Sequence, residues 1–138
     1  MGRKEARQAA FTILYQTDIQ KCPVSEILDV YYRENKISSK DKEYIDDVTK
    51  GAENNLETID GYISKGLKSW SLSRISKIDK AVLRVAIYEI FYREDIPDSI
   101  SIYEAVELVK AYNNEDAGGF VNGILRGIVR TNKDLEEK

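Results

Sequence analysis

Hydrophobic residues recur at intervals of three and four along most of the chain, which is the spacing of one face of an α-helix. The longest such stripe spans 40–68 and contains Ile45, Val48, Ala52, Leu56, Ile59, Ile63 and Leu67. No stretch alternates between apolar and polar residues for long enough to indicate a β-strand. The pattern predicts an all-α fold.

The same spacing predicts further helices at about 3–20, 24–35, 77–93, 101–112 and 117–131. The helix at 77–93 is apolar around most of its circumference, so we expect it at the centre of the fold.

These helices suggest a division of the chain into parts. Three helices precede residue 68 and three or four follow it, about seven in all, and no internal repeat is present. We therefore expect two abutting helical subdomains, at about 1–68 and 69–132, with a charged tail at 133–138.

Residues that start or stop helices set the expected boundaries. Pro23 separates the first two helices, and Pro97 ends the helix that precedes it. Ser39 is the expected N-cap of the long helix. Ser101 and Glu104 form an S-x-x-E capping box, which predicts that a helix starts at Ser101.

Composition excludes several kinds of chemistry. The chain has 138 residues, a formal net charge of −3 and no histidine. It therefore lacks the commonest general acid and base, the usual serine and cysteine nucleophile pairs, and metal sites built on imidazole. It also contains no glycine-rich phosphate loop. We expect no enzymatic activity, no metal and no cofactor.

The apolar runs fall short of the roughly 20 residues that cross a bilayer, and the N-terminus lacks the apolar region of a signal peptide. The single cysteine, Cys22, cannot form an internal disulfide and is expected to be half-buried at a helix junction. These features predict a soluble cytoplasmic protein without a membrane partner.

The first predicted helix begins with three cations, Arg3, Lys4 and Arg7, although a helix N-terminus favours anions. One edge of that helix carries a basic, a polar and two aromatic residues at steps of three and four: Lys4, Gln8, Phe11 and Tyr15. Cations beside stacking aromatic rings are typical of a site for single-stranded nucleic acid. The alternative is the ordinary solvated face of a surface helix.

A second candidate is the segment EDAGGFVNGIL. In a structural interpretation, the adjacent Gly118 and Gly119 form a turn with positive φ, and Gly123 permits tight packing. In a functional interpretation, the segment is a surface loop that exposes Asp116 and Phe120. Spacing alone favours the structural interpretation.

Aromatic residues elsewhere are expected to pack. Five tyrosines fall on predicted helices where core or half-buried packing is the ordinary expectation: Tyr31, Tyr32, Tyr88, Tyr92 and Tyr112. We expect Trp70 to be a packing wedge between the two subdomains.

Several segments resemble the NusB family of transcription antitermination proteins in their order and spacing. They are ARQAAFTILYQTD near the start, IDKAVLRVAIYEIFYREDIP in the middle, and YEAVELVKAY followed by GGFVNGILRGI near the end. The resemblance covers essentially the whole chain. It implies an all-helical fold in two subdomains, without catalysis. It further implies an RNA-binding factor that recognises the boxA element of ribosomal RNA leader transcripts together with NusE, a small-subunit ribosomal protein.

The resemblance also assigns residues to an RNA face. The basic N-terminus of the family matches Arg3, Lys4 and Arg7, and the remaining positions align with Tyr15, Asp79, Asp116 and Phe120. The two carboxylates would repel phosphate but could accept hydrogen bonds from base amino groups, which favours selectivity over affinity. Joint replacement of the three cations is expected to weaken RNA binding with little change in the melting temperature.

Two positions depart from the family pattern. Other members can carry more than three basic residues at the N-terminus, so we expect a shallower salt dependence and a greater reliance on NusE. The family commonly has Asn where Tyr103 stands, and Tyr103 is therefore assigned no role.

The implied partners are boxA RNA, NusE, and the other Nus factors and RNA polymerase of the antitermination complex. The sequence leaves open whether the free protein is a monomer or a homodimer. The competing hypothesis is a helical protein-interaction module without sequence-specific RNA binding. An accessory domain of an RNA methyltransferase is disfavoured because the chain has no cofactor motif.

Overall fold

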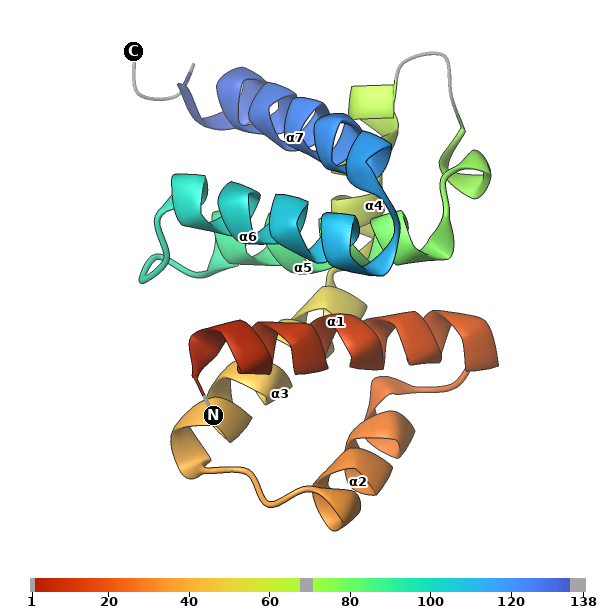
Figure 1. Cartoon of the computed structure of the whole chain (residues 1–138), viewed down its shortest axis with the longest axis vertical. Helices are drawn as coiled ribbons and strands as arrows, with labels where there is room; N and C mark the ends of the chain where they lie inside the picture. The colour runs from red at the N-terminus through yellow and green to blue at the C-terminus, as the bar shows by residue number, and fades with distance from the viewer. Residues whose placement is uncertain (1, 68–70, 135–138) are drawn as a thin grey trace.

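The computed structural model of the chain describes residues 2–67 and 71–134. The prediction for Trp70 and the end of the predicted tail, residues 135–138, lie outside these described residues. In Figure 1 the chain is coloured from its N-terminus in red to its C-terminus in blue.

The described part of the chain is helical and contains no β-strand, which confirms the all-α prediction. It includes a short 3-10 helix (Leu72–Arg74) and a π-helical turn (Arg130–Asp134). The α-helices are α1 (Arg3–Gln20), α2 (Val24–Glu34), α3 (Ser39–Asn54), α4 (Leu56–Leu67), α5 (Lys77–Tyr92), α6 (Asp98–Tyr112) and α7 (Glu115–Val129).

The stripe at 40–68 forms two helices, so the prediction of one continuous helix was wrong. The chain turns at Asn55, whose φ and ψ are −117° and 23°. The Asn55 side-chain amide donates to the Gly51 carbonyl at 2.8 Å, and this local bond caps the end of α3. At the other end of α3 the N-cap is Ser38, one residue before the predicted Ser39, and its Oγ accepts from the Asp41 N–H.

Helix α6 begins at Asp98, before the predicted capping box. Pro97 occupies the N-cap with a φ of −60°, which suits the start of a helix. Ser101 is therefore inside α6 rather than at its end, and its side chain is buried and donates to Glu89 at 2.8 Å. The capping-box prediction was wrong because Pro97 already supplies a helix start.

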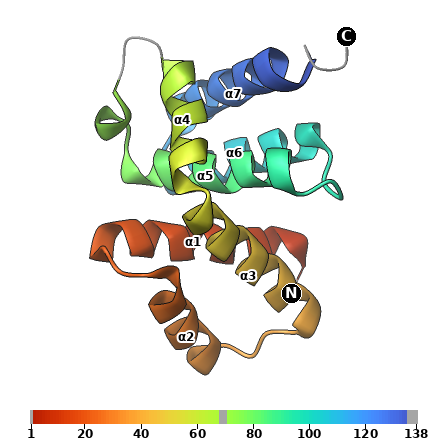
Figure 2. The same ribbon diagram turned by 180° about the vertical axis from the view of Figure 1, so that it is seen from behind.

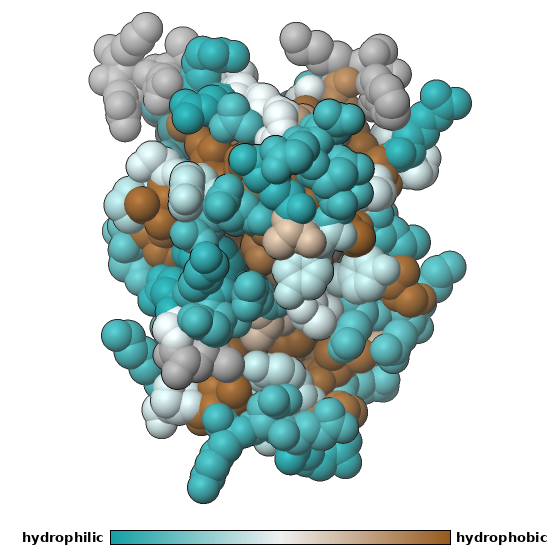
Figure 3. Space-filling model, viewed as in Figure 1, coloured by the Kyte–Doolittle hydropathy of each residue, from teal (hydrophilic) through white to brown (hydrophobic). Residues whose placement is uncertain are grey.

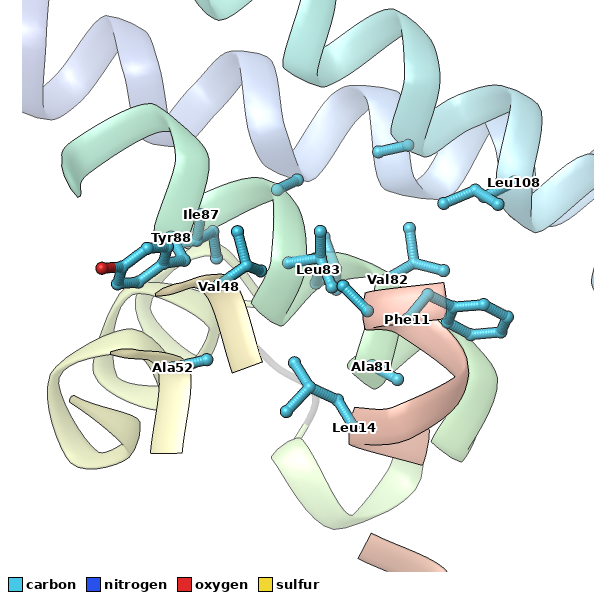
Figure 4. Packing of buried hydrophobic residues seen from close by; sticks show 14 of the residues in the cluster. Phe11, Leu14, Val48, Ala52, Ala81, Val82, Leu83, Ile87, Tyr88 and Leu108 are labelled. Carbon is cyan, nitrogen blue, oxygen red and sulfur yellow. The ribbon is translucent and has the colours of Figure 1, made fainter. Parts of the chain in front are cut away.

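Helix α5 lies at the centre of the fold, as its apolar circumference predicts. Every residue at 81–90 is buried. The helix packs against α1 and α3 on one side and against α4, α6 and α7 on the other (Figures 1 and 2). Figure 4 shows Val82 and Leu83 of α5 among side chains from neighbouring helices. Each such side chain stabilises the fold by roughly 1.5–3 kcal/mol through burial.

The helices form two groups in space. Figures 1 and 2 show α1, α2 and α3 together at one end, and α4 beside α5, α6 and α7 at the other. Helix α4 packs on α5 and α7, and the bend at Asn55 directs it towards them. A division of the chain at about residue 68 remains a prediction, and the packing places α4 with the C-terminal group.

Gly51 allows α3 and α5 to approach closely, because a Cβ atom at this position would overlap the Tyr88 ring. Tyr88 is buried, as expected, and its hydroxyl donates to Asp47 at 2.8 Å. Tyr92 and Tyr112 pack against Tyr88 and Phe11, as expected, but remain 40% and 47% exposed. The expected half-burial of Tyr31, Tyr32 and Cys22 is confirmed.

Candidate nucleic-acid interface

The first turn of α1 carries two of the three predicted phosphate-binding cations. The Arg3 guanidinium lies 4.6 Å from the centre of the Tyr44 ring and 3.9 Å from the Asp95 carboxylate. Lys4 is exposed. The Gly2 N–H donates to the Glu5 side chain at 3.1 Å, which places an anion at the helix start and offsets part of the cost of the cations there.

Arg7, the third predicted cation, points into the protein. It is 4% exposed, and its Nε and Nη2 atoms donate to the Glu89 carboxylate at 2.8 and 3.2 Å. Burial alone would lower the pKa of the Arg7 guanidinium, but its hydrogen bond to Glu89 and the Glu89 charge outweigh burial and raise that pKa. In this conformation the charged end of Arg7 holds a carboxylate and offers no face to phosphate.

Glu89 is the centre of a buried polar cluster that joins four helices. It is fully buried in α5 and accepts hydrogen bonds from Arg7 of α1, Tyr44 of α3 and Ser101 of α6. Burial raises the pKa of the Tyr44 hydroxyl, and the nearby Glu89 charge raises it further. These bonds satisfy the polar atoms that the core removes from water.

The sequence contained a signal for this cluster. The apolar helix α5 carries two charged residues in its buried stretch, Arg84 and Glu89. Buried charges are almost always paired, so each of them required an opposite charge elsewhere in the chain. Arg84 finds Asp60 of α4, at 2.8 and 2.9 Å. The pairing of Glu89 with Arg7 spans 82 positions and could not be read from spacing within one helix.

The aromatic edge of α1 is divided between core and surface. Phe11 is 3% exposed, so it does not provide the stacking ring that the nucleic-acid interpretation of this edge required. The Phe11 ring instead lies 6.3 Å from the Tyr15 ring and 5.0 Å from the Tyr112 ring of α6. Tyr15 is half-buried and keeps part of its ring at the surface. Sequence reasoning assigned Tyr112 to packing, and its exposure makes it a surface residue of this region.

Asp79 links the start of α5 to the end of α6. It is 7% exposed, and its Oδ1 accepts a hydrogen bond from the Asn113 side chain at 3.0 Å. Its backbone N–H donates to Ser76, the N-cap of α5, at 3.0 Å. The Asp79 carboxylate therefore already holds the turn between α6 and α7, beside Tyr112.

Asp116 and Phe120 lie on the first two turns of α7, four positions apart and so on one side of that helix. Asp116 is exposed in the first turn, where a carboxylate is favourable. The helix is capped by Asn114, whose Oδ1 accepts from the Ala117 N–H at 2.9 Å. Phe120 is half-buried and lines a groove of about 560 Å³ between α4 and α7. Neither Tyr15 nor Tyr112 lines this groove.

The glycines of this segment do not form the predicted turn. None of the described glycines has a positive φ, and Gly118 and Gly119 lie within α7. A Cβ at Gly118 would lie 3.1 Å from two carbon atoms of Lys110, so this glycine permits close packing of α7 on α6. A Cβ at Gly123 would meet nothing within 4 Å, so the predicted tight packing there was wrong.

A second group of cations lies at the C-terminal end of α1. The Asp18 carboxylate is 3.3 Å from Lys77, 3.5 Å from Lys80 and 3.9 Å from Arg84. Burial alone would raise the pKa of Asp18, but these three cations outweigh burial and lower it. Lys77, the first residue of α5, keeps 47% of its side chain exposed, and it was not among the residues predicted from sequence.

Figure 3 shows the face of the molecule that is turned to the viewer in Figure 1. Hydrophilic side chains cover most of it, and paler, less polar side chains lie between α6 and α1. Within residues 2–67 and 71–134, no cluster of His, Cys, Asp or Glu side chains has the arrangement of a metal site. None of the described helices is long and apolar enough to span a membrane.

Comparison with known proteins gives consistent results. The model of the NusB family matches residues 4–130. Transcription antitermination protein NusB of Acetivibrio thermocellus is 48% identical to this chain, over 94% of the chain and 90% of the relative.

Two solved structures share the fold. NusB of T. maritima superposes with a TM-score of 0.88 at 38% identity, covering 94% of this chain and 92% of the other. The NusB-like chain in a crystal structure of antitermination factors NusB and NusE in complex with dsRNA superposes with a TM-score of 0.85 at 30% identity, covering 94% and 96%. With the family match across nearly its whole length, this chain belongs to the NusB family.

Proposed function

We propose that this protein is an RNA-binding transcription antitermination factor. In this proposal it binds the boxA element of ribosomal RNA leader transcripts together with NusE, and helps RNA polymerase to read through terminators. The observation that carries the proposal is the whole-chain likeness to NusB proteins, one of which forms a complex with NusE and dsRNA. Neither the family nor its relatives indicate a catalytic activity.

The proposed RNA face consists of Arg3, Lys4, Tyr15, Asp79, Asp116 and Phe120, with Arg7 in a supporting role. Lys4 is exposed and supplies a charge for phosphate. Arg7 acts indirectly, because its ion pair with Glu89 fixes α1. Fewer exposed cations imply a weak intrinsic affinity, which is the reason to propose NusE as a necessary partner.

The remaining partners follow from the same proposal. A factor of this kind joins the other Nus factors and RNA polymerase in the cytoplasm. A homodimer of the free protein would compete with complex formation if it covered the RNA face, and light scattering of the isolated protein distinguishes a monomer from a dimer.

The second candidate function is a helical protein-interaction module without sequence-specific RNA binding. The burial of Arg7 favours it, because this removes one of three predicted phosphate contacts. Fluorescence anisotropy separates the two functions, using labelled boxA RNA and a scrambled RNA of equal length, each with and without NusE. The proposal predicts tighter binding of boxA, increased by NusE. Identical curves for the two RNAs would contradict it.

A further inference from the structure

Tyr112 is an exposed aromatic side chain held in place by the core. It is the last residue of α6, and 47% of its surface is exposed. Its ring centroid lies 5.0 Å from that of the buried Phe11, at an interplanar angle of 57°. The contact with Phe11 restrains one side of the Tyr112 ring, while nearly half of the residue's surface faces solvent.

The backbone beside Tyr112 is also restrained. The next residue, Asn113, donates its side-chain amide to Asp79 at 3.0 Å and its backbone N–H to the Val109 carbonyl at 2.8 Å. Asp79 is itself 7% exposed and belongs to the first turn of α5. The backbone next to Tyr112 is thus held to α5 while the ring packs on Phe11 of α1, so little conformational entropy is lost when a ligand stacks on the ring.

Tyr112 is linked through Phe11 to Tyr15, a residue of the proposed RNA face. The Phe11 ring centroid lies 5.0 Å from that of Tyr112 and 6.3 Å from that of Tyr15. Asp116 follows Tyr112 in the next helix, at the start of α7. An exposed aromatic ring that packs on the same core residue as Tyr15 suits a nucleobase, because bases of single-stranded RNA stack on exposed aromatic side chains.

We infer that Tyr112 is a stacking platform for one base of the bound RNA, and that Asp79, through Asn113, is the positioning residue that holds it. This inference rests on the proposed function. In this inference Asp79 contributes to RNA binding without touching phosphate, because its carboxylate already accepts a hydrogen bond from Asn113.

The matched control is Tyr103, on the same helix. Tyr103 is 59% exposed and lies nine positions before Tyr112. At about 100° per residue, nine positions place it on the opposite side of α6. Replacing either tyrosine by Ala removes the same ring from the same helix, and only one of them lies beside Phe11.

The test measures affinity for labelled boxA RNA by fluorescence anisotropy in the presence of NusE. Loss of a base stack weakens binding by about ten-fold, so we expect that increase in Kd for Tyr112→Ala. Tyr112→Phe and Tyr103→Ala should stay within about two-fold. Tyr112→Leu keeps an apolar contact with Phe11 but has no ring, so it should also bind about ten-fold more weakly than wild type, and it tests the stack even where Tyr112→Ala fails to fold.

A set of boxA RNAs with one abasic nucleotide each identifies the stacked base. At one position the abasic change should weaken wild-type binding about ten-fold and the Tyr112→Leu variant much less, because the stack is already absent. Additive losses at every position would overturn the inference, as would a loss of NusE binding without a loss of RNA binding. Equal binding of boxA and scrambled RNA by the wild-type protein would overturn the proposed function as well.

Discussion

In Figure 1 the N-terminal turns of α1 lie at the left and the turn between α6 and α7 lies at the right, and these two regions use their polar groups in opposite ways. In α1, Arg7 is directed inwards to Glu89 and Arg3 lies against Tyr44. At the α6–α7 turn, Tyr112 and Asp116 remain exposed while the buried Asp79 holds the backbone through Asn113.

This difference shows that the availability of a charge depends on partners supplied from elsewhere in the fold. Arg7 meets a carboxylate on α5, whereas Lys4, three positions earlier on the same helix, remains exposed. A cationic cluster in a sequence therefore overstates the charge that a ligand can reach.

The largest expected effect is the loss of stability on replacing Arg7, compared with the effect of replacing Lys4. Arg7→Ala leaves Glu89 as an uncompensated buried charge and should lower the free energy of unfolding by about 3–5 kcal/mol. Lys4→Ala changes an exposed residue and should stay within about 0.5 kcal/mol. Urea denaturation followed by circular dichroism measures both, and equal effects would contradict the distinction between them.

Joint replacement of Arg3, Lys4 and Arg7 is consequently expected to lower the melting temperature strongly. This prediction replaces the expectation from sequence of little change, because Arg7 is buried in the core. A salt titration of RNA binding by Lys4→Gln alone isolates the phosphate contact. One lost contact should reduce the slope of log K against log salt by about 0.7, and an unchanged slope would show that Lys4 does not touch phosphate.

The next effect concerns the α6–α7 turn. Asn113→Ala leaves the buried Asp79 carboxylate without its side-chain donor, and should lower the free energy of unfolding by about 1–3 kcal/mol. RNA affinity should fall as well if the turn positions Tyr112. Asn35→Ala is the control, since its side chain bonds only the exposed end of α2. Unchanged stability of Asn113→Ala would contradict a restrained turn.

The contribution that Asp18, near the C-terminal end of α1, makes to stability should depend on pH. The pKa of Asp18 in the folded protein is lowered, so its contribution to stability is present above the ordinary carboxyl pKa of about 3.9 and is lost as pH falls through the folded pKa. Asp18→Asn should therefore cost about 0.5–1 kcal/mol at pH 7 and nothing at the lowest pH. Urea midpoints measured from pH 7 down to pH 2 check this, and a constant difference would contradict it.

The smallest effect is expected at Asp116. A carboxylate about 4 Å from a phosphate in water costs roughly 1 kcal/mol, so Asp116→Asn should strengthen boxA binding by up to about five-fold. The control is Glu26→Gln, which removes an exposed negative charge from the first turn of another helix, α2. Equal or weaker binding by Asp116→Asn, in anisotropy titrations at fixed salt, would argue against a repulsive role.

Much of the fold follows from local pattern, and the exceptions have local causes. The apolar circumference of α5 indicated its central place correctly, because such a helix has no polar face to turn to water. The break at Asn55 was missed because apolar spacing continues across it, while a side-chain hydrogen bond ends α3. The sequence contains two possible starts for α6, Pro97 and Ser101. The helix starts after Pro97, and the Ser101 side chain instead donates a hydrogen bond to Glu89 of α5.

The candidate site was harder to predict from the sequence than the fold. Positions on one helix placed Lys4 and Tyr15 near the surface, but no helical period shows that Phe11 enters the core beside α6. The roles of Arg7 and Asp79 depend on residues 82 and 34 positions away, respectively. Such pairings arise from tertiary packing, so they could be located only in the folded chain.

The most direct test of the central claim is an NMR titration of the isotopically labelled protein with boxA RNA in the presence of NusE. The claim is that RNA meets Lys4, Tyr15 and the α6–α7 turn, while Arg7 remains paired with Glu89. The amide signals of Tyr112, Asn113 and Asp116 should shift, and the Arg7 Nε–H signal should keep its position. A large shift of the Arg7 signal, with no change at the α6–α7 turn, would contradict the account.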